Sequence, residues 1–269
     1  MKNSWWFYKE RFKALAAHVS PGLWMNYIYR ASDPLSLDLK KLPEPELLLL
    51  DYFLCDDHVF FDVGANLGYY IKRALSSRSV SIYAFEPIPF LGRQLERLFP
   101  KVHVFSLALS DRNTTKELFV PMINGQPFYS RSSLEETPGK PVDDKPYVIA
   151  VPTSTLDAFV DQHNIDRIDV IKIDVEGHEW EVIWGGRKSL EKWMPIMIVE
   201  IFAVSPKQQE YVIQRMKSWG YLGYYFDVQQ RQLVRVDSST KKSDLFNYIF
   251  IPEQSNRWNV DSINAKLVQ

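Results

Sequence analysis

The sequence predicts an open, doubly wound α/β fold, in which a mostly parallel sheet carries helices on both faces. From about residue 58, short runs rich in β-branched and aromatic residues alternate with segments of helical period, which is typical of βα units. Two strand-like runs near the C-terminus have no full helix between them and predict an antiparallel edge. The chain has 269 residues, of which 46% are hydrophobic, so it can bury a core of this size.

Each expected element follows from a hydrophobic run or a helical period. The parallel strands are expected at residues 59–63, 80–85, 102–107, 169–173 and 196–201. The helices are expected at residues 67–76, 90–99, 155–162, 179–189 and 207–219, and the antiparallel pair at 221–226 and 248–251. We therefore expect one main domain over residues 46–252, followed by a tail at 253–269.

Residues 1–45 are interpreted as a separate aromatic, basic and helical extension. Eight of the first 30 residues are aromatic, and five basic side chains against Glu10 give this stretch a net charge of +4. Aromatic and aliphatic residues from Trp5 to Val19 recur at helical spacing, which predicts an amphipathic helix. A helix packed over the main domain is the favoured role, and peripheral contact with a membrane surface is the alternative.

The stretch 121–146 interrupts the alternation of strands and helices. It contains five prolines and the turn-forming pair Asn124-Gly125. We expect a long loop here, and loops of this length inside a compact domain commonly act as lids or binding segments.

Charge and cysteine content exclude several classes of protein. The 32 basic and 33 acidic side chains nearly cancel, which argues against a nucleic-acid-binding surface. Cys55 is the only cysteine, so neither an internal disulfide nor a cysteine-based zinc site can form. No apolar run approaches the roughly 18 residues that a membrane span requires. Charged residues also interrupt the apolar region that a signal peptide would need near the N-terminus. We expect a cytoplasmic protein, in contact with the inner membrane surface only if the N-terminal helix is an anchor.

The first candidate site is the turn after the first strand, Asp62-Val63-Gly64-Ala65-Asn66-Leu67-Gly68. Gly64 and Gly68 allow a tight turn and a close approach to a ligand, and the following helix presents N–H groups to an anionic group. Asp62 can accept a hydrogen bond from a ligand ammonium. The dinucleotide fingerprint is incomplete, because Asn66 and Tyr69 replace its second and third glycines.

Acidic residues follow the next two strands. Glu86 lies 24 residues after Asp62, where a carboxylate can bind both hydroxyls of a ribose. The turn and Glu86 together predict a nucleoside site, although each alone is also typical of a packing turn or a helix cap. Ser110-Asp111 follows the third strand, and Asp111 is placed either to contact an adenine amino group or to form an Asx turn.

The fourth strand leads into a cluster of titratable side chains. Asp174, Glu176 and His178 alternate, so they share one face if the strand continues, and they are candidates for a general base. Glu179 is expected to cap the next helix. Glu200 ends the fifth strand at the same edge; together with Asp174 and Glu176 it is a candidate Mg²⁺ ligand, but support of a neighbouring ligand is its favoured role.

Taken in order, these motifs resemble the FkbM-type S-adenosylmethionine-dependent methyltransferases. The shared stretches are D-V-G-A-N-L-G from Asp62, F-E-P from Phe85, S-S-L from Ser132, T-L-D from Thr155, I-D-V-I-K-I-D-V-E-G-H-E from Ile168 and I-V-E-I from Ile198. They span residues 58–202, about half of the chain, and leave the N-terminal extension and the tail outside.

The resemblance implies a class I methyltransferase (Rossmann-like) fold with a seven-stranded sheet. It also implies O-methylation of a hydroxyl on a small-molecule or glycan acceptor, such as a sugar, a glycolipid, a polysaccharide or a related natural product. The cofactor S-adenosylmethionine would be held by Asp62, Gly64, Ala65, Asn66 and Gly68 at its methionine part, by Glu86 at its ribose, by Ser110 and Asp111 near its adenine, and by Asp174.

An activated methyl donor leaves the protein two tasks, which are to align a hydroxyl with the methyl group and to remove its proton. His178, Glu176 and Asp174 are the candidate bases, with His178 first because its ordinary pKa lies nearest to neutrality. The loop at 121–146 is expected to close over the acceptor.

Two other functions fit these motifs in part. An NAD-dependent oxidoreductase shares the βαβ unit and the ribose carboxylate, but the missing glycines argue against it. A non-catalytic methyltransferase-like module at a membrane surface would use the N-terminal helix as its anchor, but the intact site motifs favour an enzyme.

Overall fold

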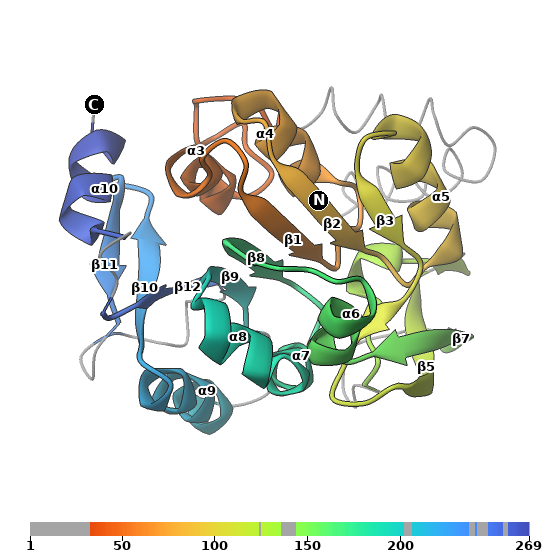
Figure 1. The fold of residues 1–269 in the computed structure, drawn as a ribbon. Coiled ribbons are helices and arrows are strands. Elements are labelled where there is room, and N and C mark those ends of the chain that lie inside the picture. The colour runs from red at the N-terminus through yellow and green to blue at the C-terminus, as the bar shows by residue number, and fades with distance from the viewer. Residues whose placement is uncertain are drawn as a thin grey trace.

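The computed structural model describes residues 33–123, 125–135, 144–201, 206–236, 240, 247–254 and 258–268. The amphipathic helix predicted within residues 1–30 lies outside these described residues. The described part contains a mixed eight-stranded sheet with helices on both faces and a second, four-stranded sheet beside it (Figure 1). The predicted α/β fold class is therefore confirmed. Among the helices of this part, none is long and apolar enough to cross a membrane.

The main sheet has the strand order β11-β10-β12-β9-β8-β1-β2-β3. Its strands are β1 (Val59–Val63), β2 (Ser81–Phe85), β3 (His103–Phe105), β8 (Val170–Ile173), β9 (Ile196–Glu200), β10 (Tyr221–Asp227), β11 (Gln232–Arg235) and β12 (Asn247–Pro252). β12 pairs antiparallel with both β9 and β10, which forms the predicted antiparallel edge. β11 then pairs with β10 and adds an eighth strand to the seven expected.

Helices pack on both faces of this sheet. One face carries η1 (Pro45–Leu49), α3 (Leu50–Phe53), α4 (Tyr69–Ser77), α5 (Pro89–Leu98) and α10 (Val260–Leu267). The other face carries α6 (Leu156–Gln162), α7 (Glu179–Gly185), α8 (Arg187–Trp193) and α9 (Pro206–Ser218). The single helix expected at 179–189 is two helices, because the chain leaves helical geometry at Gly186. Ile263 and Leu267 of α10 lie in the same core as α3 and α4, so the C-terminal segment packs on the domain.

The central strands are buried along their whole length, as their nearly continuous hydrophobic sequences require. Two residues of these strands are charged and yet buried, Asp62 in β1 and Lys172 in β8. They are register partners on neighbouring strands, and they are only 1% and 5% exposed. Opposite charges held side by side offset part of the cost of burying each other.

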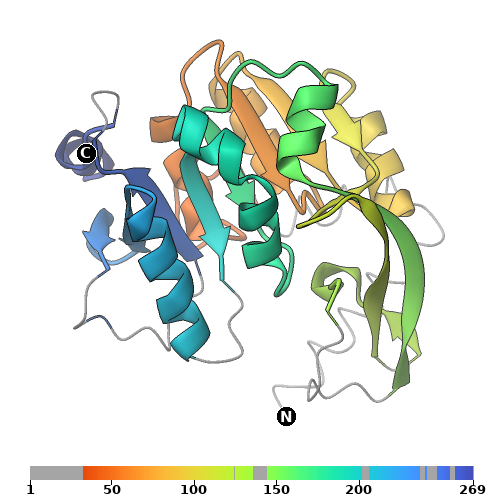
Figure 2. The same cartoon turned by 60° about the horizontal axis from the view of Figure 1, so that its bottom comes forward.

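The stretch expected as one long loop, residues 121–146, is entered at both ends by long strands that the sequence did not predict. β5 (Thr114–Ile123) and β7 (Asp144–Ser154) form a long antiparallel hairpin, which joins β4 (Ala108–Leu109) and β6 (Gln126–Pro127) in the second sheet. Figure 2 shows this hairpin extending away from the main sheet. The strand expected at 102–107 ends early, at Phe105, because the chain then crosses into the second sheet at β4.

Pro121, one of the prolines that predicted a loop, lies at an irregularity of the hairpin. The register of β5 against β7 shifts between Val120 and Met122, which is where Pro121 lies. A bulge tolerates proline because it leaves a residue outside the regular ladder of hydrogen bonds. The short helix η2 (Tyr129–Arg131) follows β6 and leads toward the main sheet.

Candidate active site

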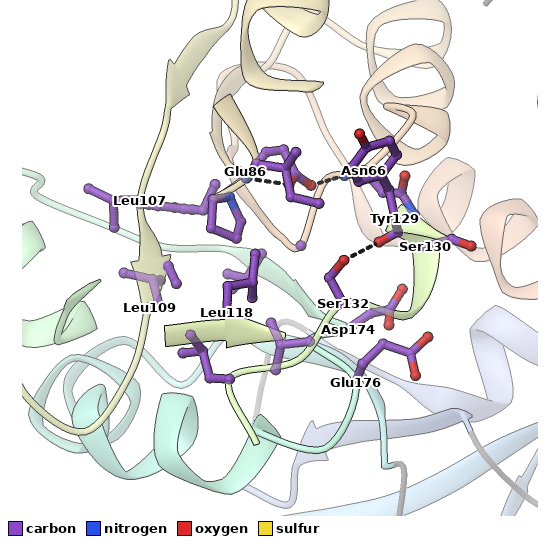
Figure 3. A pocket seen from close by; sticks show the side chains of 18 residues that line it. Asn66, Glu86, Leu107, Leu109, Leu118, Tyr129, Ser130, Ser132, Asp174 and Glu176 are labelled. Atoms are coloured by element: carbon purple, nitrogen blue, oxygen red, sulfur yellow. Dashed lines mark hydrogen bonds between the residues drawn. The ribbon is translucent and has the colours of Figure 1, made fainter. Parts of the chain in front are cut away.

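A cavity of about 600 Å³, part of it open to solvent, lies at the carboxyl ends of β1, β2 and β8. Open α/β sheets bind their ligands at this edge. In Figure 3, Asn66 and Glu86 lie on one side of the cavity, and Asp174 and Glu176 lie on the other. The cavity therefore brings together residues from three of the predicted motifs.

The second sheet supplies the rest of the cavity wall. Leu118 of β5 lines it, as do Tyr129, Ser130, Ser132 and Leu134 from the segment after β6. Part of the stretch expected to act as a lid thus lines the cavity. Ser132 and Leu134 belong to the S-S-L motif, which the sequence alone did not assign to any task.

The turn between β1 and α4 is fixed against β2. The N–H groups of Gly64 and Ala65 both donate to the carbonyl oxygen of Phe85, at 3.0 Å each. Gly64 has a φ of +79°, and a Cβ atom there would lie 1.9 Å from the carbonyl oxygen of Asp174, so only glycine fits. Gly68 has a φ of +73° and is the N-cap of α4.

Glu86 accepts hydrogen bonds at both of its oxygens. Its Oε2 accepts the N–H of Asn66 at 2.8 Å, and its Oε1 accepts the N–H of Ile88 at 2.9 Å. The side chain is 4% exposed, and burial raises the pKa of Glu86 to about 7. Each carboxylate oxygen keeps a second lone pair, so Glu86 can still accept hydrogen bonds from a pair of ligand hydroxyls.

Lys172 connects the strands beneath this turn. Its Nζ donates to the carbonyl oxygen of Gly64 at 3.0 Å, and it lies 3.0 Å from Asp174 Oδ2 and 3.8 Å from Asp62 Oδ1. Although burial opposes it, the two carboxylates raise the pKa of Lys172, so the ammonium stays charged. The sequence interpretation did not assign Lys172; a lone charge within an apolar strand was the signal.

Asp62 precedes the lining residues Val63 and Gly64 but does not itself line the cavity. It is 1% exposed, and neither of its oxygens has a hydrogen-bond partner among the described residues. Burial raises the pKa of Asp62 to about 6. A buried carboxylate in this state gains from a cation brought near it, which fits the predicted role beside a ligand ammonium.

Two further acids adjoin Asp174. Although burial alone would raise it, the pKa of Asp174 is lowered by Lys172 and by a hydrogen bond from Glu200. Burial and the neighbouring Asp174 raise the pKa of Glu200 to about 9, so Glu200 is the protonated partner at neutral pH. Burial also raises the pKa of Glu44 to about 7, and Glu44 Oε2 accepts a hydrogen bond from Tyr70 Oη at 2.9 Å.

These contacts bear on the predicted magnesium ligands. Asp174 is paired with Lys172 and hydrogen-bonded by Glu200, so its oxygens already have partners. Over the residues that the structure describes, no three His, Cys, Asp or Glu side chains form a group that could hold a metal ion.

The alternation of Asp174, Glu176 and His178 does not place them on one face. β8 ends at Ile173, and Glu176 and Gly177 then adopt left-handed backbone conformations, with φ of +56° and +102°. Asp174 and Glu176 line the cavity, whereas His178 is 0% exposed and does not. The three residues were expected to share a face only if the strand continued, and that condition is not met.

Ser110 and Asp111 also lie outside the cavity lining. Ser110 Oγ lies 2.9 Å from His178 Nε2, and Asp111 is bound by Arg112 at 2.8 Å and Lys116 at 3.6 Å. The hydrogen bond from Arg112 lowers the pKa of Asp111 to about 2. Leu107 and Leu109 line the cavity at this strand end instead.

The T-L-D motif is structural. Thr155 Oγ1 accepts the N–H of Ala158 at 3.0 Å and caps α6. Asp157 accepts the N–H and the hydroxyl of Ser189, at 2.8 Å and 2.7 Å, and so ties α6 to α8.

Comparison with known proteins places this architecture in a family. A family model of the methyltransferase FkbM domain matches residues 62–222, which is more than half of the chain. The 2-O-methyltransferase NoeI of Sinorhizobium fredii is 30% identical over 146 residues, which cover 51% of this chain and 60% of the relative. The hexuronic acid methyltransferase AglP of Haloferax volcanii is 27% identical over 168 residues, 60% of this chain and 64% of the relative.

The chain thus spans less than two thirds of the length of either relative. A crystal structure of methyltransferase FkbM from Methylobacillus flagellatus is 13% identical, with a TM-score of 0.45, over 89% of this chain and 53% of that one. The match to residues 62–222 includes the β1–α4 turn, Glu86 and the β8–α7 segment that surround the cavity. The chain therefore belongs to the FkbM family of methyltransferases.

Proposed function

We propose that this chain is an S-adenosylmethionine-dependent O-methyltransferase that acts on a hydroxyl of a sugar or a related glycan. The observation that carries the proposal is the cavity itself, where the β1–α4 turn and Glu86 meet Asp174 and Glu176. Membership of the FkbM family supports methyl transfer. The names of the two relatives, a 2-O-methyltransferase and a hexuronic acid methyltransferase, support a sugar hydroxyl as acceptor.

The residues present fit this cofactor. Glu86 offers two acceptor oxygens for the hydroxyls of a ribose, and Leu107, Leu109 and Leu118 offer an apolar wall for a flat base. Asp62 is a buried carboxylate whose oxygens have no hydrogen-bond partner among the described residues. Lys172 Nζ lies 3.8 Å from Oδ1, so the carboxylate keeps the capacity to accept a hydrogen bond from a ligand ammonium. When bound, S-adenosylmethionine supplies an electrophilic methyl group on a positively charged sulfur.

The protein must also accept the proton of the acceptor hydroxyl. Of the three predicted bases, Asp174 and Glu176 line the cavity and His178 does not. Asp174 is ion-paired with Lys172 at 3.0 Å, and its lowered pKa makes it a poor proton acceptor. We therefore assign the base to Glu176, with Asp174 as a fixed negative charge in the wall.

Calorimetric titration with S-adenosylhomocysteine tests the cofactor, with NAD titrated in parallel. We expect micromolar binding of the thioether nucleoside, no binding of NAD, and loss of binding in an Asp62→Ala, Glu86→Ala double variant. Glu96→Ala, an exposed carboxylate on α5, is the matched control and should bind normally. Circular dichroism establishes that each variant is folded.

The outcome separates the candidate functions. Binding of NAD in place of S-adenosylhomocysteine would favour the oxidoreductase. Binding of neither would favour the non-catalytic module, and liposome flotation of the full chain beside a chain lacking residues 1–30 would then test the predicted membrane contact. If the nucleoside binds, Glu176→Gln should keep its affinity and lose methylation of a panel of methyl glycosides.

A further inference from the structure

His178 lies between three segments of the chain. Its Nε2 lies 2.9 Å from Ser110 Oγ, at the end of β4, and its Nδ1 lies 2.9 Å from Glu135 Oε1, directly after the cavity-lining segment. His178 itself is the N-cap of α7. The imidazole therefore joins the second sheet, the cavity wall and the β8–α7 turn at one point.

The charged side chains around the His178 imidazole favour one of its two neutral tautomers. Lys116 Nζ faces Nε2 at 3.5 Å, whereas Glu135 and Glu181 face Nδ1 at 2.9 Å and 3.6 Å. A hydrogen on Nδ1 can be donated to Glu135, and Nε2 then accepts from Lys116 or from Ser110. Ser110 Oγ has one hydrogen, and His178 Nε2 at 2.9 Å and Asp111 Oδ1 at 3.1 Å are its two acceptors. The opposite tautomer would turn the Nδ1 lone pair toward two carboxylates and an N–H toward an ammonium.

Serine, histidine and a carboxylate in this order form the triad of many hydrolases. Ser110 is 0% exposed, however, and does not line the cavity, so no substrate carbonyl can reach its hydroxyl. We therefore expect Ser110, His178 and Glu135 to have a structural effect on the segments that they connect.

The segment that they hold is the cavity wall after β6. Tyr129, Ser130, Ser132 and Leu134 line the cavity, and Glu135 follows them directly. The neighbouring Ser133 strengthens the attachment, because its Oγ donates to the carbonyl oxygen of Glu176 at 2.7 Å. The backbone of Ser133 also exchanges two hydrogen bonds with Phe119 of β5, at 2.8 Å and 3.1 Å.

We propose that His178 is a positioning residue, which clamps the wall at residues 129–135 against the main sheet by bonding Glu135 and Ser110 simultaneously. The bond to Glu135 fixes the end of the wall, and the bond to Ser110 fixes the ring to the sheet. The predicted effect of His178 on cofactor affinity rests on the proposed function. The predicted effect of His178 on the position of residues 129–135 does not depend on that function.

The hydrogen on the ring is the first readout. In nitrogen-15 NMR spectra of the full chain at pH 7.5, we expect a neutral ring with its hydrogen on Nδ1, assigned by its absence from His178→Asn. Glu135→Ala should shift the Nδ1 resonance, because the acceptor at 2.9 Å is lost, although Glu181 and Lys116 still favour the same tautomer. Glu135→Gln should restore the resonance, because the amide oxygen still accepts. A hydrogen on Nε2 in the unmodified protein, or no change in Glu135→Ala, would overturn the proposal.

Hydrogen exchange is the second readout. We expect the amides of residues 125–135, including Ser133, to exchange about tenfold faster in His178→Asn and Glu135→Ala, because one charge-assisted hydrogen bond is lost. Exchange in β10 should be unchanged. Glu117→Ala, which removes an exposed carboxylate from the same hairpin, is the control and should exchange like the parent. Unchanged exchange in Glu135→Ala would contradict the clamp even if His178→Asn fails to fold.

Affinity for S-adenosylhomocysteine then links the clamp to function. The dissociation constant should rise about tenfold in Glu135→Ala and recover in Glu135→Gln. If the parent protein does not bind this ligand, the proposed function fails, but the spectra and the exchange rates still decide the role of His178. If the parent binds and Glu135→Ala binds equally well, the clamp has no role in ligand binding.

Discussion

Lys172 Nζ donates a hydrogen bond to the carbonyl oxygen of Gly64 at 3.0 Å, although 108 positions separate the two residues in the chain. The bond ties β8 to the turn that forms one wall of the cavity. The same ammonium lies beside Asp62 and Asp174, so one buried cation sets both the position of the turn and the charge around it.

Replacing Lys172 with methionine should lower the free energy of unfolding by about 3–5 kcal/mol, because two buried carboxylates lose their cation. Guanidinium unfolding at pH 7.5 measures the loss. Lys101→Met changes an exposed lysine and should cost less than about 0.5 kcal/mol. Equal stability of the two variants would show that Lys172 does not offset the buried carboxylates.

Two glycine substitutions separate backbone strain from steric conflict. Gly64 and Gly125 have similar φ values, +79° and +71°, but a Cβ at Gly64 would meet the carbonyl oxygen of Asp174, whereas one at Gly125 meets nothing within 4 Å. Gly125→Ala should therefore cost about 1–2 kcal/mol of unfolding free energy, from strain alone. Gly64→Ala should cost about 1–3 kcal/mol more. Urea unfolding that gives the same loss for both would contradict this geometry.

The affinity for S-adenosylhomocysteine should depend on pH through Glu86. Burial raises the pKa of Glu86 to about 7, and only the carboxylate can accept two further hydrogen bonds from hydroxyls. About one tenth of the protein carries that carboxylate at pH 6, so the dissociation constant should fall about tenfold between pH 6 and pH 8. Titrations at four pH values measure the slope. In Glu86→Gln the binding should be weaker and this slope reduced, and an unchanged slope would exclude Glu86 as its source.

The stability of the ligand-free protein should fall as the pH rises, in part because of Glu200. Burial and Asp174 raise the pKa of Glu200 to about 9 in the folded protein, while the unfolded chain releases this proton near the ordinary glutamate value of about 4.3. The folded state therefore binds more protons across this interval, and the free energy of unfolding decreases with increasing pH.

Glutamine at position 200 isolates this effect. Glu200→Gln keeps a hydrogen-bond donor for Asp174 but cannot ionise. Thermal unfolding between pH 5 and pH 9 should therefore show a shallower decline for the variant than for the parent. Parallel curves would show that Glu200 releases its proton at the same pH in both states.

The sequence was informative where a local pattern fixes the structure. The first strand was predicted with its observed bounds, Val59–Val63, because a central parallel strand is a continuous hydrophobic run. The turn at Gly64 and the acid at Glu86 were likewise recognisable, since the strand ends of a βαβ unit meet at one edge of the sheet.

Prediction failed where distant parts of the chain decide the outcome. Five prolines predicted a loop at 121–146, but no local pattern indicated β5 and β7 on either side of it. These strands are stabilised by pairing with each other and enter the stretch at 121–123 and 144–146. The positions of Asp174, Glu176 and His178 depended on two left-handed residues, Glu176 and Gly177, and glutamate gives no local sign of that conformation. The role of Lys172 could not be predicted because it depends on Asp62, its register partner in another strand.

The seam between the two sheets is the point where the chain crosses from β3 to β4, and β4 then pairs with β7 inside the second sheet, at Ala108↔Thr153 and Leu109↔Ser154. The hairpin of that sheet ends far from this seam, close to the segment that walls the cavity (Figure 2). Insertions or substitutions at the hairpin end therefore leave unaltered the buried strands that contain Asp62 and Lys172 and the strand that Glu86 follows. Under the proposed function, changes at the hairpin end would alter the choice of acceptor and leave the residues proposed to bind the cofactor in place.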